Sequence, residues 1–351
     1  MINLASNCGL NCTTLLLLKI IMSQSFKNPL PQKVAVIFSD VKRKYFDTDE
    51  SFVTEQEVPL NAERISKIIN GMGIATILVP SDEEMVSKLI EFKPDVCLNL
   101  VDTVRGKDKT AAVIPGILDL LNLPYTGSGM FGINLGSDKY LINQLLRTHQ
   151  VSVPKCQFFY SSETVVDPGL TYPLILKLNE IHGSVDITQD SIVENEDQLK
   201  SKVSQLINDY HQPVVAEEFI SGAELTVAIL EDGDLKIFVA EKEFLDKSKK
   251  YLIADYDIKW SNNDWAGLHF KPYTNPSPAL LEDIRKAAKA TKLLGYGRID
   301  VRLNQQNQHF IIDINHNPYI GPDESGPTFT AVLKMFGLSF EDYLKIILTN
   351  Y

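Results

Sequence analysis

Residues 295–318 constrain the fold of this chain more than any other stretch; they read GYGRIDVRLNQQNQHFIIDINHNP. The pattern predicts an antiparallel hairpin in which Asn304 lies opposite His309 across a polar turn. Because side chains alternate between faces along a strand, one face of this hairpin is apolar and the other is polar. The apolar face holds Ile299, Val301, Leu303, Phe310, Ile312 and Ile314; the polar face holds Arg298, Asp300, Arg302, Ile311, Asp313 and Asn315.

This register sets two carboxylates against each other. Asp300 lies directly across from Asp313, and Asn315 follows two residues further along the same face. Like charges in opposed positions repel, so the pair requires a compensating cation. The flanking arginines allow a surface charge ladder, which contributes little stability. The oxygen ligands also suit Mg²⁺, and the stiff run after Pro318 favours a site. The pattern alone leaves both interpretations open.

Length and composition limit the class of protein. The 351 residues are enough for two or three domains with a sizeable core. A net charge of -11 opposes general nucleic-acid binding, which needs a basic surface. No apolar run has the length of a membrane span. The four cysteines lack paired CxxC spacing, which favours a reducing compartment without a zinc site. We therefore expect a cytoplasmic protein with neither a nucleic-acid nor a membrane partner.

Residues 1–32 are not expected to be part of the fold. Their apolar run, Leu15–Leu18, lacks the positively charged start and the small-residue cleavage site of a signal peptide. Met22 opens a polar stretch that leads into Pro29 and Pro31. We hypothesise that translation begins at Met22. A protein starting there should be soluble and fully active, and loss of activity on this truncation would contradict the hypothesis.

Residues 33–130 alternate between predicted strands (33–38, 74–79, 95–100) and predicted helices (61–72, 81–92, 112–122), the second helix being capped by Ser81. This alternation indicates a parallel sheet with helices packed on it. Such sheets bind ligands beyond the carboxyl ends of their strands. Two basic loops leave those ends, one with Lys42, Arg43 and Lys44 and the other with Arg105, Lys107 and Lys109. They indicate either an anionic ligand or ordinary solvated loops.

A lysine interrupts an apolar strand in the following segment. The run Ser137-Asp138-Lys139 reads as a cap that is followed by a helix to His149. Beyond it, Leu174, Leu176 and Leu178 share one strand face while Lys177 lies on the other. A buried lysine is costly unless its ammonium group reaches water or meets an anion, and both outcomes stay open.

From about Pro124 to the C-terminus, the order of motifs resembles the ATP-grasp superfamily, in its D-alanine–D-alanine ligase-like branch. The motifs are PYTGSG, SDK, YPLILK, VVAEEFISGAELTVAIL, DYDIKW, GYGRIDVRL and FIIDIN. The resemblance implies a three-domain α/β (α+β) architecture. Its parts would be a substrate-side parallel α/β domain (33–130), a central ATP-grasp subdomain (131–222) and a C-terminal ATP-grasp subdomain with the magnesium site (223–351). ATP would lie between the second and third parts.

The resemblance implies roles for individual residues around ATP. Lys139 and Lys177 resemble the two lysines that neutralise the nucleotide phosphates, and Ser184 lies in the loop that covers them. Glu224 resembles the ribose-binding acid. The adenine hinge would consist of Glu217, Glu218, Phe219 and Ile220.

The resemblance also implies catalytic and metal-binding residues. Lys259 falls where a mobile loop delivers a lysine to the terminal phosphate, and Arg298 resembles an arginine beside the transferring phosphoryl group. Asp300, Asp313 and Asn315 resemble the ligands of one or two Mg²⁺ ions, for which Mn²⁺ can substitute. These are the oxygen ligands that the hairpin register brings to one face.

The implied chemistry is carboxylate activation by an ATP-grasp ligase. A substrate carboxylate attacks the γ-phosphate of ATP, and an amine then displaces phosphate from the acyl phosphate to give an amide. Such chemistry depends on positioning and charge neutralisation. The expected partners are a small-molecule carboxylate and an amine, and a homodimer is left open. A small-molecule kinase and a non-catalytic nucleotide-binding module are the alternatives.

Several positions depart from the ligase pattern. Asp313 stands where glutamate is usual, and Tyr319 replaces a glycine near the substrate carbonyl. Asp186 replaces a glycine in the phosphate-covering loop, and Trp260 replaces a tyrosine. The run Asn99-Leu100-Val101-Asp102 stands near an absent His-Gly motif. These departures predict that the substrates are not two D-alanines. The basic loops, Arg105 above all, predict a substrate with an additional negative charge.

Overall fold

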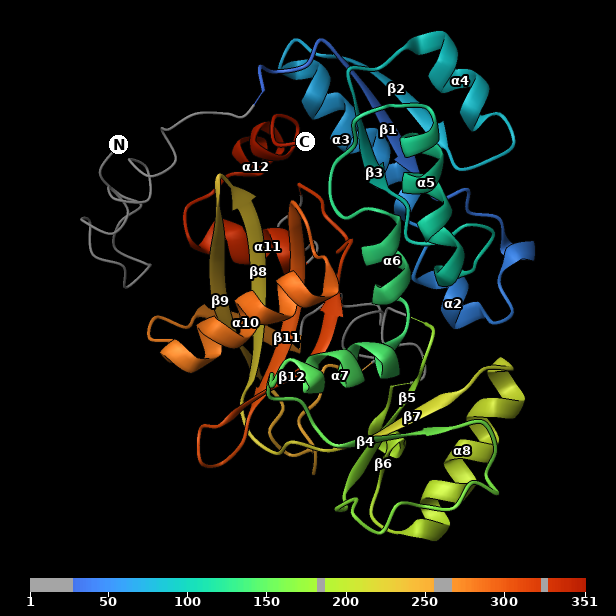
Figure 1. The fold of residues 1–351 in the computed structure, drawn as a ribbon, viewed down its shortest axis with the longest axis vertical. Helices are drawn as coiled ribbons and strands as arrows, with labels where there is room; N and C mark the ends of the chain where they lie inside the picture. Colours follow the sequence, from blue (N-terminus) through green and yellow to red (C-terminus); the bar gives the residue numbers. More distant parts are fainter. Residues whose placement is uncertain (1–27, 182–186, 256–266, 323–327) are drawn as a thin grey trace.

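The structure is a computed structural model, and it describes residues 28–181, 187–255, 267–322 and 328–351. The described residues form a mixed α/β fold with three sheets, as predicted (Figure 1). Asn28 is hydrogen-bonded through its side-chain amide to the carbonyl oxygens of Thr349 and Tyr351. The expectation that residues 1–32 lie outside the fold is therefore wrong for residues 28–32. Residues 1–27, including Met22, lie outside the described residues.

The first sheet is parallel, with strand order β2-β1-β3, which confirms the predicted arrangement. Its elements are β1 (Lys33–Phe38), α2 (Asp49–Val53), α3 (Val58–Gly71), β2 (Ala75–Pro80), α4 (Met85–Phe92), β3 (Val96–Leu100) and α5 (Val113–Leu120). The predicted Ser81 cap is wrong, because α4 begins at Met85. Ser81 instead binds the loop after β1: its Oγ accepts from the Asp40 backbone N–H at 3.2 Å.

The second sheet is antiparallel, with strand order β4-β7-β5-β6. Its elements are β4 (Cys156–Phe159), β5 (Leu174–Leu178), β6 (Ile192–Val193), α8 (Glu196–Tyr210) and β7 (Val214–Glu218). Leu174, Leu176 and Leu178 are buried in one hydrophobic cluster with residues of α8, which covers that face of the sheet (Figure 1). The alternation predicted for this strand is therefore confirmed, and Lys177 lies on the uncovered face.

The third sheet is antiparallel, with strand order β10-β9-β8-β11-β12. Its strands are β8 (Glu224–Asp232), β9 (Asp234–Phe244), β10 (Leu268–Pro272), β11 (Tyr296–Leu303) and β12 (His309–Asn315). One face packs against α7 (Lys139–Thr148) and α10 (Pro278–Thr291), while part of the other lies against α11 (Thr328–Met335) and α12 (Phe340–Ile347). This second core also contains residues of α3 and β1, so it joins the first sheet to the third. Between them runs α6 (Met130–Gly136).

In the hairpin of β11 and β12, the predicted register is present at the end that carries the two aspartates and absent toward the turn. Asp300 pairs with Asp313, as predicted, but Val301 then pairs with Ile311. A β-bulge inserts Ile312 as an extra residue, and a one-residue slip exchanges the two faces. Ile311 is consequently buried in the core, and Ile312 lines a cavity. The predicted faces of these two isoleucines are therefore wrong.

Within the residues that the structure describes, no helix combines the length and the apolar character that crossing a membrane requires.

Candidate active site

A cavity of about 1100 Å³ lies where the three sheets meet. The uncovered face of the second sheet forms one wall, and the third sheet forms the opposite wall. The loops after the strands of the first sheet close one end, as expected for a parallel sheet that presents its carboxyl edge to a ligand. Charged side chains from all three parts reach this space, so the fold gathers polar groups that are far apart in the sequence.

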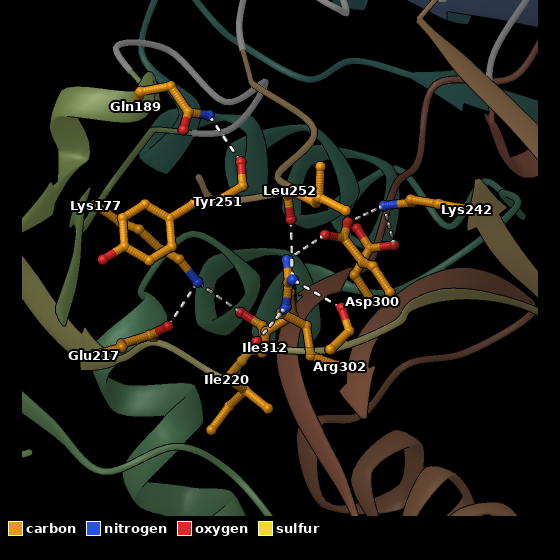
Figure 2. A network of polar contacts seen from close by, with 12 residues as sticks. Lys177, Gln189, Glu217, Ile220, Lys242, Tyr251, Leu252, Asp300, Arg302 and Ile312 are labelled. Carbon is orange, nitrogen blue, oxygen red and sulfur yellow. Dashed lines mark hydrogen bonds and ion pairs between the residues drawn. The ribbon is translucent and has the colours of Figure 1, made fainter. Parts of the chain in front are cut away.

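Two partly buried lysines lie in the cavity wall. Lys177 Nζ is 2.6 Å from Glu217 Oε2 and donates to the Ile312 carbonyl at 3.1 Å (Figure 2). Burial acts to lower its pKa, but Glu217 outweighs burial, so the pKa is raised. Lys139, at the start of α7, donates to the Ile181 carbonyl, and burial lowers its pKa. Lys177 therefore meets an anion instead of extending to water, which decides between the two outcomes left open by the sequence.

The segment after β7 bends around one arginine. Arg302 Nε donates to the Ile220 carbonyl at 2.7 Å, and Nη2 donates to Gly222 and Leu252 carbonyls at 3.2 and 3.0 Å (Figure 2). Its guanidinium also stacks on the Phe219 ring, 4.7 Å from the ring centroid. Glu218 accepts from the Thr171 backbone N–H. Arg302, which the sequence set beside the acid pair, instead holds the shape of the predicted hinge.

A chain of alternating charges crosses the third sheet. Each pair is within ion-pair distance: Arg302–Glu224 at 2.8 Å, Glu224–Lys242 at 2.6 Å, Lys242–Asp300 at 3.2 Å, Asp300–Arg298 at 3.2 Å and Arg298–Asp313 at 3.9 Å. The sequence reasoning missed Lys242. The feature that could have indicated Lys242 was the hairpin of β8 and β9, in which Lys242 pairs with Glu224. The compensation required by the opposed aspartates therefore comes from two cations, Lys242 on β9 and Arg298 on β11.

The three candidate metal ligands line the cavity together. The Asp313 side chain is 27% exposed and that of Asp300 is 9% exposed. Asn315 Oδ1 accepts from the Asn317 backbone N–H at 2.9 Å and can accept on its second lone pair. No group of three or more His, Cys, Asp and Glu side chains with metal-site geometry occurs among the described residues. Two carboxylates with an amide oxygen nevertheless fit the hard-ligand chemistry of Mg²⁺.

Three acids gather at the first-sheet end of the cavity, and the sequence reasoning did not single them out as a group. Glu55, Asp102 and Asp108 all line it. Burial, with Asp102 and Asp108 nearby, raises the pKa of Glu55 well above its usual range. Burial and Asp108 raise the pKa of Asp102 to about 8. Glu55 is 8% exposed, and its Oε2 has no hydrogen-bond partner among the described residues. This end of the cavity therefore favours a cation.

The ligand-free protein is expected to lose stability as the pH rises toward 8. The pKa of Asp102 is 3.8 ordinarily and about 8 in the folded protein. Between these values the folded protein holds a proton that the unfolded chain has released, so the free energy of unfolding falls with pH. Asp102→Asn removes this titration and flattens the slope. Thermal melts of both proteins across the range measure it; identical slopes would contradict the burial of this carboxyl.

The two basic loops do not form the expected anion site. Arg105 pairs with Glu83 at 2.6 Å with its side chain 63% exposed, and it is absent from the cavity lining. Lys42 pairs with Asp40, and Arg43 with Asp49, also outside the lining. The predicted role of Arg105 in holding a substrate is therefore wrong. Lys107 and Lys109 do line the cavity, and Lys109 is paired with Glu180.

The positions that depart from the ligase pattern divide into three groups. Tyr319 and Asp102 line the cavity. Asn99 is buried beneath it, and its Oδ1 accepts from the Val101 backbone N–H, so the expectation that Asn99 shapes the substrate pocket is wrong. The remaining positions, Asp186 and Trp260, lie outside the described residues, as do the predicted site residues Ser184 and Lys259.

The comparison with protein families decides the assignment. The family described as D-ala D-ala ligase C-terminus matches residues 145–349. The chain belongs to the D-alanine–D-alanine ligase family. It is an ATP-grasp ligase, which confirms the predicted family and enzyme class.

Individual relatives agree with this family. The D-alanine–D-alanine ligase of Aquifex aeolicus is 26% identical over 302 residues, covering 84% of this chain and 96% of the relative. The enzyme of the same name from Geobacter sulfurreducens is 26% identical over 305 residues, covering 84% and 90%. Each alignment covers more of this chain than the match over residues 145–349 does, so the similarity extends beyond the C-terminal match.

Solved structures share the fold. The ATP complex of D-alanine–D-alanine ligase from Bacillus anthracis superposes with a TM-score of 0.65 at 19% identity, covering 91% of this chain and 97% of that one. The VanG D-Ala:D-Ser ligase from Enterococcus faecalis gives a TM-score of 0.64 at 21% identity, covering 90% and 98%. This ligase therefore has the ATP-grasp architecture predicted from its motifs.

Proposed function

We propose that this ligase joins a carboxylate to an amine through an acyl phosphate, and that its preferred substrates are not two D-alanines. One observation most strongly supports the joining of a carboxylate to an amine. A single cavity holds the partly buried lysines Lys139 and Lys177 beside the opposed aspartates, and it continues to the acids Glu55 and Asp102. Cations suited to phosphate therefore share one space with acids suited to an amino group.

ATP would lie between the second and third sheets. Lys139 and Lys177 would neutralise its phosphates, and Glu224 would bind its ribose. Lys177 is already charged and paired with Glu217. Binding of a phosphate would therefore replace one anionic partner by another and would need no proton transfer. We assign residues 131–222 and 223–351 to the two ATP-grasp subdomains and 33–130 to the substrate side. Ser184 and Lys259 complete the proposed nucleotide site, and the hinge is formed by Glu217, Glu218, Phe219 and Ile220.

Mg²⁺, or Mn²⁺ in its place, would be held by Asp313 and Asn315, with Asp300 beside them. The bound ion would neutralise phosphate charge as the phosphoryl group transfers. Arg298 would neutralise the same negative charge as it develops on the phosphoryl group. Its Nε is buried without a hydrogen-bond partner among the described residues, although it lies 3.2 Å from Asp300 Oδ2. An N–H that is poorly satisfied in the cavity wall is suited to donate to an incoming anion.

The proposed reaction has two steps. An oxygen of the substrate carboxylate attacks the γ-phosphorus, the bond to the β-phosphate oxygen breaks, and ADP leaves. The amine nitrogen then attacks the acyl carbon, phosphate leaves with the bridging oxygen, and the nitrogen releases a proton. Lys139, Lys177 and Arg298 would hold the phosphoryl group in line and spread its charge, since this chemistry depends mainly on positioning and electrostatics.

The acid cluster indicates a substrate with an ammonium group, in contrast to the anionic substrate predicted from the basic loops. An ionised carboxylate buried without a partner is costly, and an ammonium group would pair with it. Glu55 Oε2 provides an acceptor without a protein partner among the described residues. Amino acids carry both the carboxylate that the reaction activates and the ammonium group that this cluster would accept.

Chelation is expected to stop turnover without unfolding the protein. The residues that hold the fold together are apolar clusters and ion pairs that need no metal, whereas phosphoryl transfer requires neutralised phosphate charge. EDTA should therefore abolish phosphate release, excess Mg²⁺ should restore it, and thermal melts with and without EDTA should coincide. A large fall in melting temperature with EDTA would indicate a structural metal instead.

Product analysis tests the proposed function. The protein is incubated with Mg-ATP and pools of D- and L-amino acids, dipeptides and polyols, and phosphate release and product masses are followed. The proposal predicts ADP, free phosphate and an amide whose mass is that of its two substrates less water. A phosphorylated alcohol would indicate a kinase, and nucleotide binding without turnover would indicate a non-catalytic module.

A further inference from the structure

Lys242 places a fixed positive charge inside the nucleotide end of the cavity. It lies on β9 with only 6% of its surface exposed. Its Nζ is 2.6 Å from Glu224 Oε1 and 3.2 Å from Asp300 Oδ1, and Figure 2 draws the contact with Asp300. The ammonium group therefore bridges two buried carboxylates, one proposed for ribose binding and the other proposed as a metal ligand.

The two opposed aspartates consequently have different environments. Asp300 has Lys242 on Oδ1 and the Arg298 Nε at 3.2 Å from Oδ2, so both of its oxygens face cations. Asp313 Oδ2 lies 3.9 Å from Arg298 Nη2, and the Asp313 side chain is three times as exposed as that of Asp300, at 27% against 9%. Asp313 thus presents its carboxylate to the cavity, whereas a metal on Asp300 must displace a buried cation.

We propose that Lys242 takes the place of one metal ion, so that the nucleotide-loaded enzyme holds a single divalent cation, on Asp313 and Asn315. This inference rests on the ATP site of the proposed function. A dication bound to Asp300 would lie within a few ångströms of the ammonium group, where like charges repel strongly because water is excluded. Releasing Lys242 is also costly, because it would remove one of the two cations paired with the buried Glu224.

Counting bound Mn²⁺ tests this inference. Free Mn²⁺ is measured by electron paramagnetic resonance during titration of the protein with a saturating non-hydrolysable ATP analogue, and analogue binding is measured in parallel by calorimetry. The wild-type protein should bind one Mn²⁺ per chain. Lys242→Met, which keeps the length of the side chain and removes its charge, should bind a second Mn²⁺ at least about ten-fold more tightly than the wild type does.

A matched control lies on the same strand. Lys236 pairs with Asp232 outside the cavity, so Lys236→Met should leave the count at one. If Lys242→Met does not fold, Lys242→Met combined with Glu224→Gln removes one charge of each sign and carries the same prediction. Two tightly bound Mn²⁺ ions in the wild type would overturn the inference, as would an unchanged count after loss of the lysine. Either result with normal analogue binding leaves the ligase proposal intact, whereas failure of the wild-type protein to bind the analogue would contradict both.

Discussion

Asp313→Ala is expected to reduce ATP turnover by about a thousand-fold while the fold stays intact, a loss typical of removing a principal electrostatic stabiliser. Both opposed carboxylates line the cavity, and Asp313 is the more exposed of the two. Its removal also relieves a like-charge contact with Asp300. The melting temperature of the ligand-free protein should therefore stay unchanged or rise slightly. Phosphate release and thermal melts measure the two effects.

The control for this variant is Asp234→Ala, which removes an exposed carboxylate at the turn between β8 and β9. It should retain wild-type turnover and stability. Normal turnover by Asp313→Ala would show that the metal assignment is wrong. Unfolding of that variant would give Asp313 a structural role that its exposure does not predict.

Arg302→Met should lower the free energy of unfolding by about 3–5 kcal/mol, because it removes one partner of a buried ion pair. Arg302 is 4% exposed. Without it, Glu224 loses one of its two cations, and three carbonyl oxygens lose a donor. The segment that carries Phe219 and Ile220 should loosen, so affinity for ATP should also fall. Urea denaturation and nucleotide titration measure these effects.

Two further variants separate charge from geometry at this position. Arg302→Lys keeps the charge but loses the planar guanidinium that reaches several acceptors. The stability of this variant should therefore lie between that of Arg302→Met and that of the wild type. Arg285→Met removes an arginine that is exposed on α10 and should change stability little. A loss below about 1 kcal/mol for Arg302→Met, the value of a surface pair, would contradict the assigned role.

The hairpin of β11 and β12 could be predicted up to the bulge and no further. The alternation of charged and apolar residues places Asp300 and Asp313 on one face, because a one-residue slip would bury the charges and expose the core; the predicted pairing of the two is observed. The bulge at Ile312 has no such marker, since neighbouring isoleucines are equivalent in a hydrophobic pattern. One extra residue then exchanged Ile311 and Ile312 between the faces. The resulting carbonyl of Ile312 accepts from Lys177, a contact between two sheets that strand patterns do not contain.

The residues of the candidate site likewise divide into those that the sequence could indicate and those that it could not. Lys177 could be found because a lysine in an apolar strand requires an explanation, and the surrounding motifs supplied one. Lys242 was missed although its pairing with Glu224 in the hairpin of β8 and β9 was a signal, because the side chain alone resembles a surface charge. Glu55 could not be found, because the acids near it, Asp102 and Asp108, lie on another loop. The prediction for Arg105 was wrong because the position of a loop does not fix the direction of its side chains. The Arg105 side chain pairs with Glu83.

The acyl phosphate is the central claim, and transfer of a heavy-oxygen label tests it most directly. Pooled amino acids labelled in their carboxylates are incubated with unlabelled Mg-ATP, and the released phosphate is analysed by mass spectrometry. Attack by the carboxylate on the γ-phosphate leaves its oxygen as the bridge, and the amine then expels that oxygen with the phosphate. The account predicts one labelled oxygen in each phosphate released with an amide product. Unlabelled phosphate released alongside that product would contradict it.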